Sequence, residues 1–126
     1  MPLHREMGTP EIKSFDCIDQ DPIDQWSPGS EADVHYSLCL HIGSVGGEGA
    51  DRFHVVVVTP QAITEHNLGR TLPKRCIMVS PYSWENVLKE VQARLARCVG
   101  DDWNRQSRLL AEHFSWEFEE RARHSL

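Results

Sequence analysis

The sequence predicts an α+β fold, in which an antiparallel sheet of about four strands is followed by two C-terminal helices packed on one face. Strand patterns fill the first two thirds of the chain and helical patterns follow them, an order typical of α+β proteins. The length of 126 residues, with 40% hydrophobic and 25% charged residues, is that of one globular domain. We expect a loose N-terminal arm over residues 1–10, a single domain over residues 11–121 and a tail over residues 122–126.

Four segments carry strand patterns, over residues 11–18, 33–43, 53–59 and 76–79. The second segment is the clearest, because apolar residues occupy every other position in it. The residues between the first and second segments, and those between the second and third, are rich in glycine, proline, serine and aspartate. We therefore expect loops there.

The second and third strand segments are predicted to form a hairpin across the glycine-rich loop. If Ile42 lies opposite Phe53, then Leu40 lies opposite Val55. That register makes one face of the hairpin continuously apolar, as burial against a helix requires.

Two helices are predicted to follow the strands. The first spans about residues 83–98, with Ser83 as its N-cap, and its apolar residues form one stripe: Trp84, Val87, Leu88, Val91, Leu95 and Cys98. The second begins after Asp101 or Asp102. We expect Trp84, Trp103 and Trp116 to be mostly buried, joining these helices to the sheet.

Charge is distributed unevenly along the chain. The formal net charge is −6, which argues against nucleic acid or an anionic membrane as the ligand. Residues 1–51 carry a net charge of −8 and residues 52–126 a net charge of +2. An acidic half suits a basic protein partner, and solubility explains it equally well.

The sequence also indicates a compartment. The longest apolar run, residues 55–58, is far shorter than the roughly 20 residues of a membrane span, and the first residues lack the apolar core of a signal peptide. We therefore expect a cytoplasmic protein whose four cysteines are free thiols.

A metal site is the first alternative that the residues leave open. His35, Cys39 and His41 share one face of the predicted strand, and the register places His54 opposite His41. Imidazole and thiolate are zinc ligands, so a small metal-dependent enzyme or metal-binding domain is one interpretation. The spacing matches no zinc signature, and an ordinary polar strand face is the simpler interpretation. We expect no catalytic residue, metal or cofactor.

Taken in order, several short segments resemble the immunity protein 8 family of bacterial polymorphic toxin systems. They are Ile12–Phe15, Ile42–Gly43, Gly46, Gly49–Phe53, Val57–Pro60, Trp84, Cys98–Trp103 and Phe114–Glu119. The structural motif residues among them are Trp84, Trp103, Trp116, Glu117, Phe118 and Glu119. The sequence departs from the family at Glu120-Arg121, where the family often has Asp-Tyr.

The resemblance implies a small α+β protein that binds and neutralises a cognate toxin domain, without catalysis or cofactor. Because opposite charge speeds association, the acidic half is predicted to meet a basic toxin, such as a nuclease. The expected contact residues are Asp19, Asp21, Asp24, Trp26, Glu31, Asp33, Glu48 and Asp51. A subunit-interaction domain that meets no toxin is the second alternative.

Overall fold

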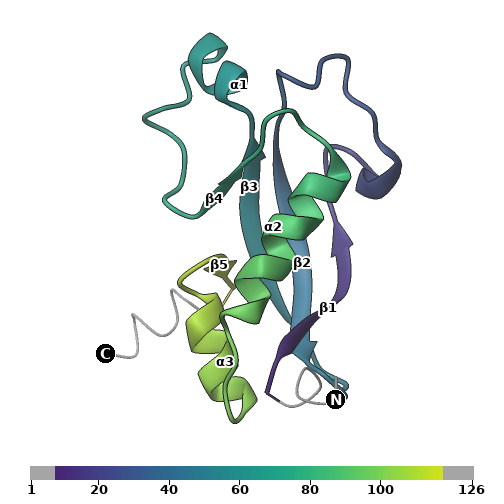
Figure 1. The fold of residues 1–126 in the computed structure, drawn as a ribbon, viewed down its shortest axis with the longest axis vertical. Helices are drawn as coiled ribbons and strands as arrows, with labels where there is room; N and C mark the ends of the chain where they lie inside the picture. The colour runs from purple at the N-terminus through teal and green to yellow at the C-terminus, as the bar shows by residue number, and fades with distance from the viewer. Residues whose placement is uncertain (1–7, 118–126) are drawn as a thin grey trace.

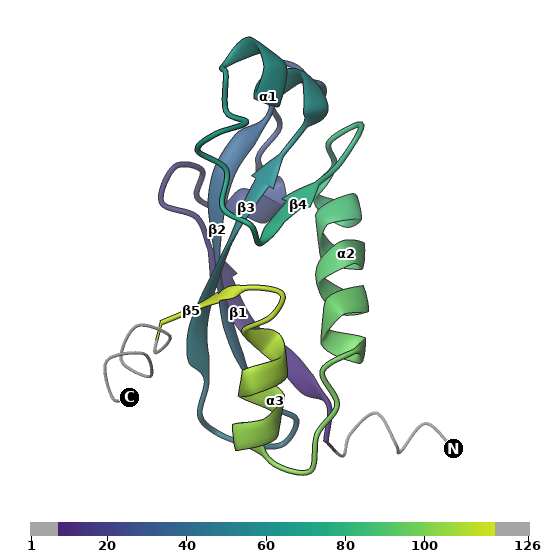
Figure 2. The same cartoon turned by 90° about the vertical axis from the view of Figure 1, so that its left-hand side faces the viewer.

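The structure, a computed structural model, describes residues 8–117. Its strands are β1 (Pro10–Asp16), β2 (His35–Ser44), β3 (Asp51–Val58), β4 (Cys76–Met78) and β5 (Ser115–Trp116). Its helices are the 3-10 turn η2 (Ile23–Gln25), α1 (Pro60–Glu65), α2 (Trp84–Ala96) and α3 (Trp103–Leu110). In Figures 1 and 2, α2 lies across one face of the sheet, and α3 packs beside the lower end of the sheet. The predicted α+β fold with C-terminal helices is therefore confirmed.

The sheet has the strand order β1-β2-β3-β4, and β5 also pairs with β3. Strand β2 is antiparallel to both β1 and β3, and β5 is antiparallel to β3. Strand β4 instead runs parallel to the end of β3, which departs from the all-antiparallel expectation. Parallel strands need a long crossover connection, and residues 59–75, including α1, supply one.

The hairpin register differs from the predicted one by two residues. Val55 lies opposite Leu38, and Leu40 lies opposite Phe53, so the predicted Leu40–Val55 pair was wrong. Leu40 and Val55 still share the buried face, because side chains alternate with a period of two. Toward the loop the strands extend further than expected, to Ser44 and from Asp51, and the two sides of the loop approach closely there: a Cβ on Gly43 would lie 2.1 Å from the carbonyl oxygen of Gly49.

The core lies between the inner face of the sheet and the helices. Helix α2 buries Val87, Val91 and Leu95 there, together with residues of β2 and β3. Its N-cap is Ser83 as predicted, because the Ser83 hydroxyl accepts a hydrogen bond from the backbone N–H of Asn86 at 3.0 Å. Asp102 caps α3 in the same way, through the N–H of Arg105 at 2.9 Å.

The three tryptophans at the helix–sheet boundary are only partly exposed, so most of each side chain is buried as expected, although none is fully enclosed. Trp84, Trp103 and Trp116 all pack against the core from its margin. Trp84 contacts Phe15 of β1, with ring centroids 4.9 Å apart. An indole N–H needs a hydrogen-bond partner, which holds such residues where a polar group is within reach.

All four cysteines lie in the described part of the chain and are free. Within residues 8–117, no helix combines the length and apolar character that crossing a bilayer requires.

Candidate functional site

The acidic loop, defined here as residues 19–33, is held firmly against the core. Ile23 in its η2 turn is only 1% exposed. Trp26 packs edge-on against Tyr36 and Tyr82, with ring centroids 5.8 and 5.5 Å apart. The backbone N–H of Tyr82 donates to the carbonyl of Glu31 at 2.9 Å. The loop is therefore anchored at its middle and at its end.

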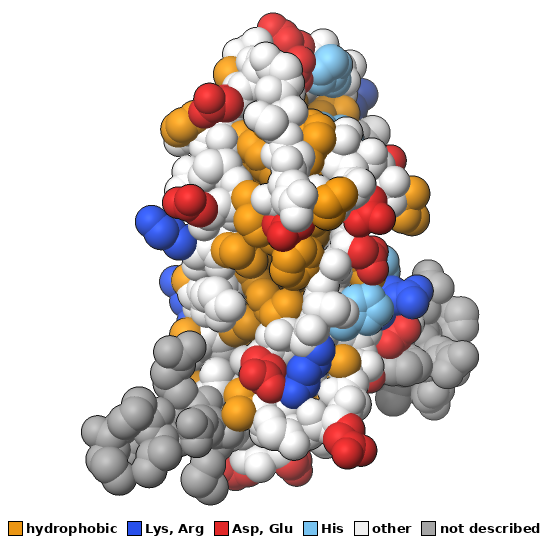
Figure 3. Space-filling view, turned by 90° about the vertical axis from the view of Figure 1, so that its right-hand side faces the viewer, with side chains coloured by type: hydrophobic (Ala, Val, Ile, Leu, Met, Phe, Trp, Pro, Cys, Tyr) orange, Lys and Arg blue, Asp and Glu red, His pale blue; other side chains and the backbone are white. Residues whose placement is uncertain are grey.

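The carboxylates of this loop point to solvent. Asp19, Asp21, Asp24 and Glu31 are exposed, whereas Asp33 is half-buried and lies 3.0 Å from Nε2 of His66. Figure 3 views the side of the molecule that carries β1 and the acidic loop, and the apolar area at its centre is bordered by acidic, basic and histidine side chains. Five of the predicted acidic contact residues thus belong to one loop, which Trp26 fastens to the core through Tyr36 and Tyr82.

Two other predicted contact residues lie elsewhere. Glu48 is exposed in the turn that follows β2, whereas Glu31 and Asp33 precede that strand. Ten residues of strand span roughly 30 Å, so Glu48 belongs to the opposite end of the sheet. Asp51 lies at that end too, as the first residue of β3.

The carboxylate of Asp51 is occupied within the fold. Its Oδ2 accepts hydrogen bonds from the indole Nε1 of Trp103 at 3.1 Å and of Trp116 at 3.2 Å. The next inward residue of β3, Phe53, stacks on Trp116 with centroids 6.1 Å apart and meets Trp103 edge-on at 6.4 Å. Asp51 and Phe53 together fasten α3 and β5 to the start of β3.

Glu117 completes this junction. Its Oε1 accepts from the backbone N–H of Arg52 at 2.8 Å, and its own N–H donates to the carbonyl of Arg52 at 3.1 Å. The other predicted motif residues here, Phe118 and Glu119, lie outside the described residues. Three of the segments that carried the family resemblance, Gly49–Phe53, Cys98–Trp103 and Phe114–Glu119, therefore meet here, although about 50 residues or more separate the first from the other two.

The outer face of the sheet, turned away from α2, carries the histidines and the cysteine considered as metal ligands. Sγ of Cys39 lies 3.8 Å from Nε2 of His41, which lies 3.4 Å from Oδ2 of Asp16 on β1. Because the register is shifted, His54 lies opposite Cys39, and the predicted His41–His54 pair was wrong. His35 lies opposite Val58, away from this cluster.

A cavity of about 320 Å³ adjoins the cluster, and Asp16, Asp19, Cys39, Arg52 and His54 are among its lining residues. Burial raises the pKa of the Cys39 thiol above its ordinary value, and the charge of Asp16 raises it further. Sequence reasoning missed Asp16 as a member of this cluster, because its position on the outer face depends on the pairing of β1 with β2.

A family comparison identifies the chain. A model of the family described as Immunity protein 8 matches residues 10–121, which is most of the chain. The chain belongs to the immunity protein 8 family. No curated protein and no solved structure gives a significant match.

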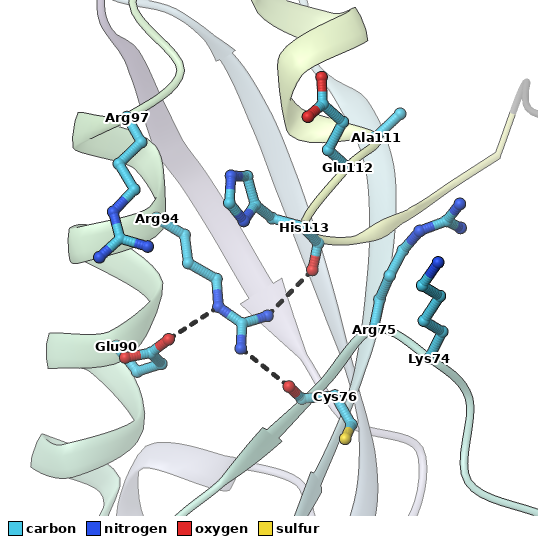
Figure 4. Close-up of a pocket in the computed structure, with 9 residues that line it drawn as sticks. All are labelled: Lys74, Arg75, Cys76, Glu90, Arg94, Arg97, Ala111, Glu112 and His113. Carbon is cyan, nitrogen blue, oxygen red and sulfur yellow. Dashed lines mark hydrogen bonds and ion pairs between the residues drawn. The ribbon is translucent and has the colours of Figure 1, made fainter.

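A second cavity in this immunity protein 8 family member was not anticipated from its sequence. It measures about 680 Å³ and lies between α2, β4 and the segment after α3 (Figure 4). Arg94 stands at its centre and donates to Oε2 of Glu90 at 2.9 Å and to the carbonyls of Cys76 and His113 at 2.8 and 3.0 Å. Burial and the charge of Arg94 lower the pKa of His113.

Arg94, which lines this cavity, connects separate parts of the immunity protein 8 domain. The Arg94 guanidinium joins three separate segments and also lies over the ring of Phe114, 5.8 Å from its centroid. Figure 4 shows Lys74 and Arg75 pointing away from Arg94. The one trace of this arrangement in the sequence is the i,i+4 spacing of Glu90 and Arg94, which is typical of a helix ion pair.

Proposed function

We propose that this immunity protein 8 family member is a non-catalytic inhibitor that binds the cognate toxin domain through its acidic loop. The supporting observation is the combination of exposed carboxylates at Asp19, Asp21, Asp24 and Glu31 with a loop backbone fixed to the core by Ile23 and Trp26. We infer that it acts in the cytoplasm of a bacterial cell and protects that cell from the toxin.

Preorganisation is the first reason to choose this loop. A segment that is already ordered loses little conformational entropy when it binds, so more of the interaction energy appears as affinity. The packing of Trp26 between Tyr36 and Tyr82 supplies that order. The half-exposed edge of Trp26 also offers an aromatic contact within the charged surface.

Electrostatics is the second reason. Carboxylates grouped on one surface attract a basic partner and raise its association rate by factors of 10 to 1,000, in a salt-dependent way. A nuclease-type toxin presents a basic cleft for phosphates, and aspartates on a fixed loop imitate the charge of those phosphates. The inhibitor then works by occupying the cleft and needs no chemistry of its own.

The test uses the cognate toxin domain. Asp21→Lys, Asp24→Lys and Glu31→Lys are combined in one variant, because all three side chains are exposed. Association and dissociation rates are measured at low and high salt, and protection of cells that express the toxin is scored. We expect association to slow at least tenfold at low salt, with a smaller effect at high salt.

A matched variant carries the same change in charge at exposed acids elsewhere, as Glu65→Lys, Asp101→Lys and Glu112→Lys. It should associate much faster than the loop variant and protect cells like the original protein. Equal slowing in both variants would mean that net charge alone matters. Unchanged rates and protection in the loop variant would exclude this surface and favour the C-terminal Glu117, Glu119 and Glu120.

A further inference from the structure

On the outer face of the sheet, a carboxylate, a thiol and an imidazole lie close together, those of Asp16, Cys39 and His41. The geometry points to a binding site there for a zinc-type transition-metal ion, with Asp16 Oδ2, Cys39 Sγ and His41 Nε2 as its ligands. Asp19, one of the proposed toxin-contact residues, lines the adjoining cavity, but the test of the metal site does not involve the toxin.

The distances between the candidate ligand atoms suit zinc. Tetrahedral Zn²⁺ holds a thiolate sulfur and an imidazole nitrogen about 3.6 Å apart, and a nitrogen and a carboxylate oxygen about 3.3 Å apart. The corresponding distances are 3.8 Å between Cys39 and His41 and 3.4 Å between His41 and Asp16. All three ligand atoms lie within 4.8 Å of one another. The side chain of Asp16 is 54% exposed, so it is free to turn toward the sulfur.

The backbone positions these ligands through a bulge in β1. Ile12 lies opposite Ile42, but after the bulge at Lys13 the register shifts, so that Ser14 lies opposite His41 and Asp16 opposite Cys39. If the pairing continued regularly from Ile12, with no bulge, Asp16 would lie opposite Leu38 and face the core. The bulge therefore brings Asp16 to the outer face, beside the cysteine, and bulges commonly redirect a side chain in this way.

The surroundings leave a fourth coordination position open. His54 lies across from Cys39 on β3, and with Asp19 it lines the adjoining cavity. Arg52 lines the same cavity and opposes a cation, whereas Asp16, Asp19 and the thiolate form of Cys39 attract one. An open position toward a cavity lets water, His54 or an external ligand complete the coordination.

Binding requires the thiol to lose its proton. The ion therefore competes with a proton for the sulfur, and affinity should increase as the pH rises.

The experiment titrates the full chain, purified without a histidine tag, with Co²⁺ and then with Zn²⁺ under a phosphine reductant. A thiolate–cobalt charge-transfer band in the near ultraviolet should appear and saturate at one ion per chain. Zn²⁺ should abolish that band by displacing the cobalt. Calorimetry then gives the affinity for Zn²⁺ itself.

Three variants each remove one ligand, and two matched controls change the same residue types away from the site. Asp16→Asn, Cys39→Ser and His41→Gln should each weaken Zn²⁺ binding on the order of 100-fold, and Cys39→Ser should eliminate the band. Cys76→Ser on β4 and His35→Gln on β2 should bind as the original protein does.

The proposal is overturned if the original chain shows no thiolate–cobalt band. It is also overturned if Asp16→Asn and His41→Gln both bind undiminished, or if His35→Gln loses as much affinity as His41→Gln. Circular dichroism of the metal-free variants confirms that they fold. Asp16→Asn keeps the test valid if Cys39→Ser does not fold, because Asp16 is exposed.

Discussion

Asp51 at the start of β3 accepts a hydrogen bond from the indole of Trp103 at the start of α3, with Oδ2 and Nε1 3.1 Å apart. The same oxygen accepts from Trp116 at 3.2 Å. One carboxylate thus satisfies two half-buried indoles and connects the last helix and the last strand to the hairpin. Its loss would leave both N–H donors without this partner.

Replacing Asp51 by Ala should lower the free energy of unfolding by about 2–3 kcal/mol, because it removes an ionised acceptor from two partly buried donors. Urea unfolding followed by tryptophan fluorescence measures this loss. Glu48→Ala is the control, since Glu48 is an exposed acid close by in the chain, and it should stay within about 0.5 kcal/mol of the original. Equal effects of the two substitutions would contradict a structural role for Asp51.

Replacing Trp103 by Ala should cost about 3 kcal/mol, at the lower end of the range for tryptophan, because the side chain is half-buried. The lost interactions are the ring contact with Phe53 and the hydrogen bond to Asp51. Thermal unfolding gives a direct readout. An unchanged melting temperature would show that the indole contributes nothing to the fold.

Replacing Arg94 by Ala should destabilise the domain by about 2–4 kcal/mol. The guanidinium donates to the carbonyls of Cys76 and His113, and hydrogen bonds from charged donors are the stronger class. Arg97→Ala removes the same charge from an exposed position one turn away and should cost less than about 0.5 kcal/mol. Chemical denaturation of both variants makes the comparison, and similar losses would contradict the proposed role.

The two tyrosines of the chain make stability fall at high pH. Burial raises the pKa of both Tyr36 and Tyr82, whose hydroxyls lie 3.0 Å apart. Below about pH 10, both the folded and the unfolded chain keep these protons, so stability does not depend on them. Above that pH the unfolded chain releases protons that the folded chain retains, and each tyrosine lowers the free energy of unfolding by up to about 1.4 kcal/mol per pH unit.

This dependence has a direct optical test, because the chain contains only these two tyrosines. Tyrosinate absorbance should appear cooperatively, together with the loss of helical circular dichroism. Tyr36→Phe should make the decline of stability with pH less steep. Cys98 contributes from a lower pH, since burial raises the pKa of its thiol to about 11. A gradual tyrosinate titration centred near pH 10 in a folded protein would contradict the prediction.

Gly43→Ala should destabilise the hairpin by about 1–3 kcal/mol, because the new methyl group would meet the carbonyl oxygen of Gly49 at 2.1 Å. Gly49→Ala is the matched control: a Cβ there meets no atom within 4 Å, and it should be tolerated. Thermal unfolding compares the two. Equal tolerance would mean that the loop moves away without cost.

The hairpin shows how far the sequence determines the fold. Alternation of apolar residues correctly assigned Leu40 and Val55 to one buried face, but a shift of two residues preserves that alternation. The observed register is accompanied by a close approach of Gly49 to Gly43, a contact between backbones that the alternation does not encode. The helix N-caps were predictable because they are local: Ser83 and Asp102 each accept a hydrogen bond from a backbone N–H three residues later in the chain.

The sites show the same limit. The acidic residues were visible in the sequence, but the division between Asp21 at one end of the sheet and Asp51 at the other depends on the fold. Asp16 and Arg94 were missed because their partners lie on other elements, reached through strand pairing and helix docking. Features that depend on residues a few positions apart, such as helix caps, were predictable. Contacts between segments distant in the chain were not.

The bulge at Lys13 lets β1 carry one residue more than the stretch of β2 with which it pairs. Deleting Lys13 would restore regular pairing and leave the later pairs in place, with Phe15 opposite Leu40 and Asp16 opposite Cys39. Loss of this residue should therefore change the local twist of the strand and leave its two faces as they are. Relatives of this chain whose first strand is one residue shorter should lack the residue at this position.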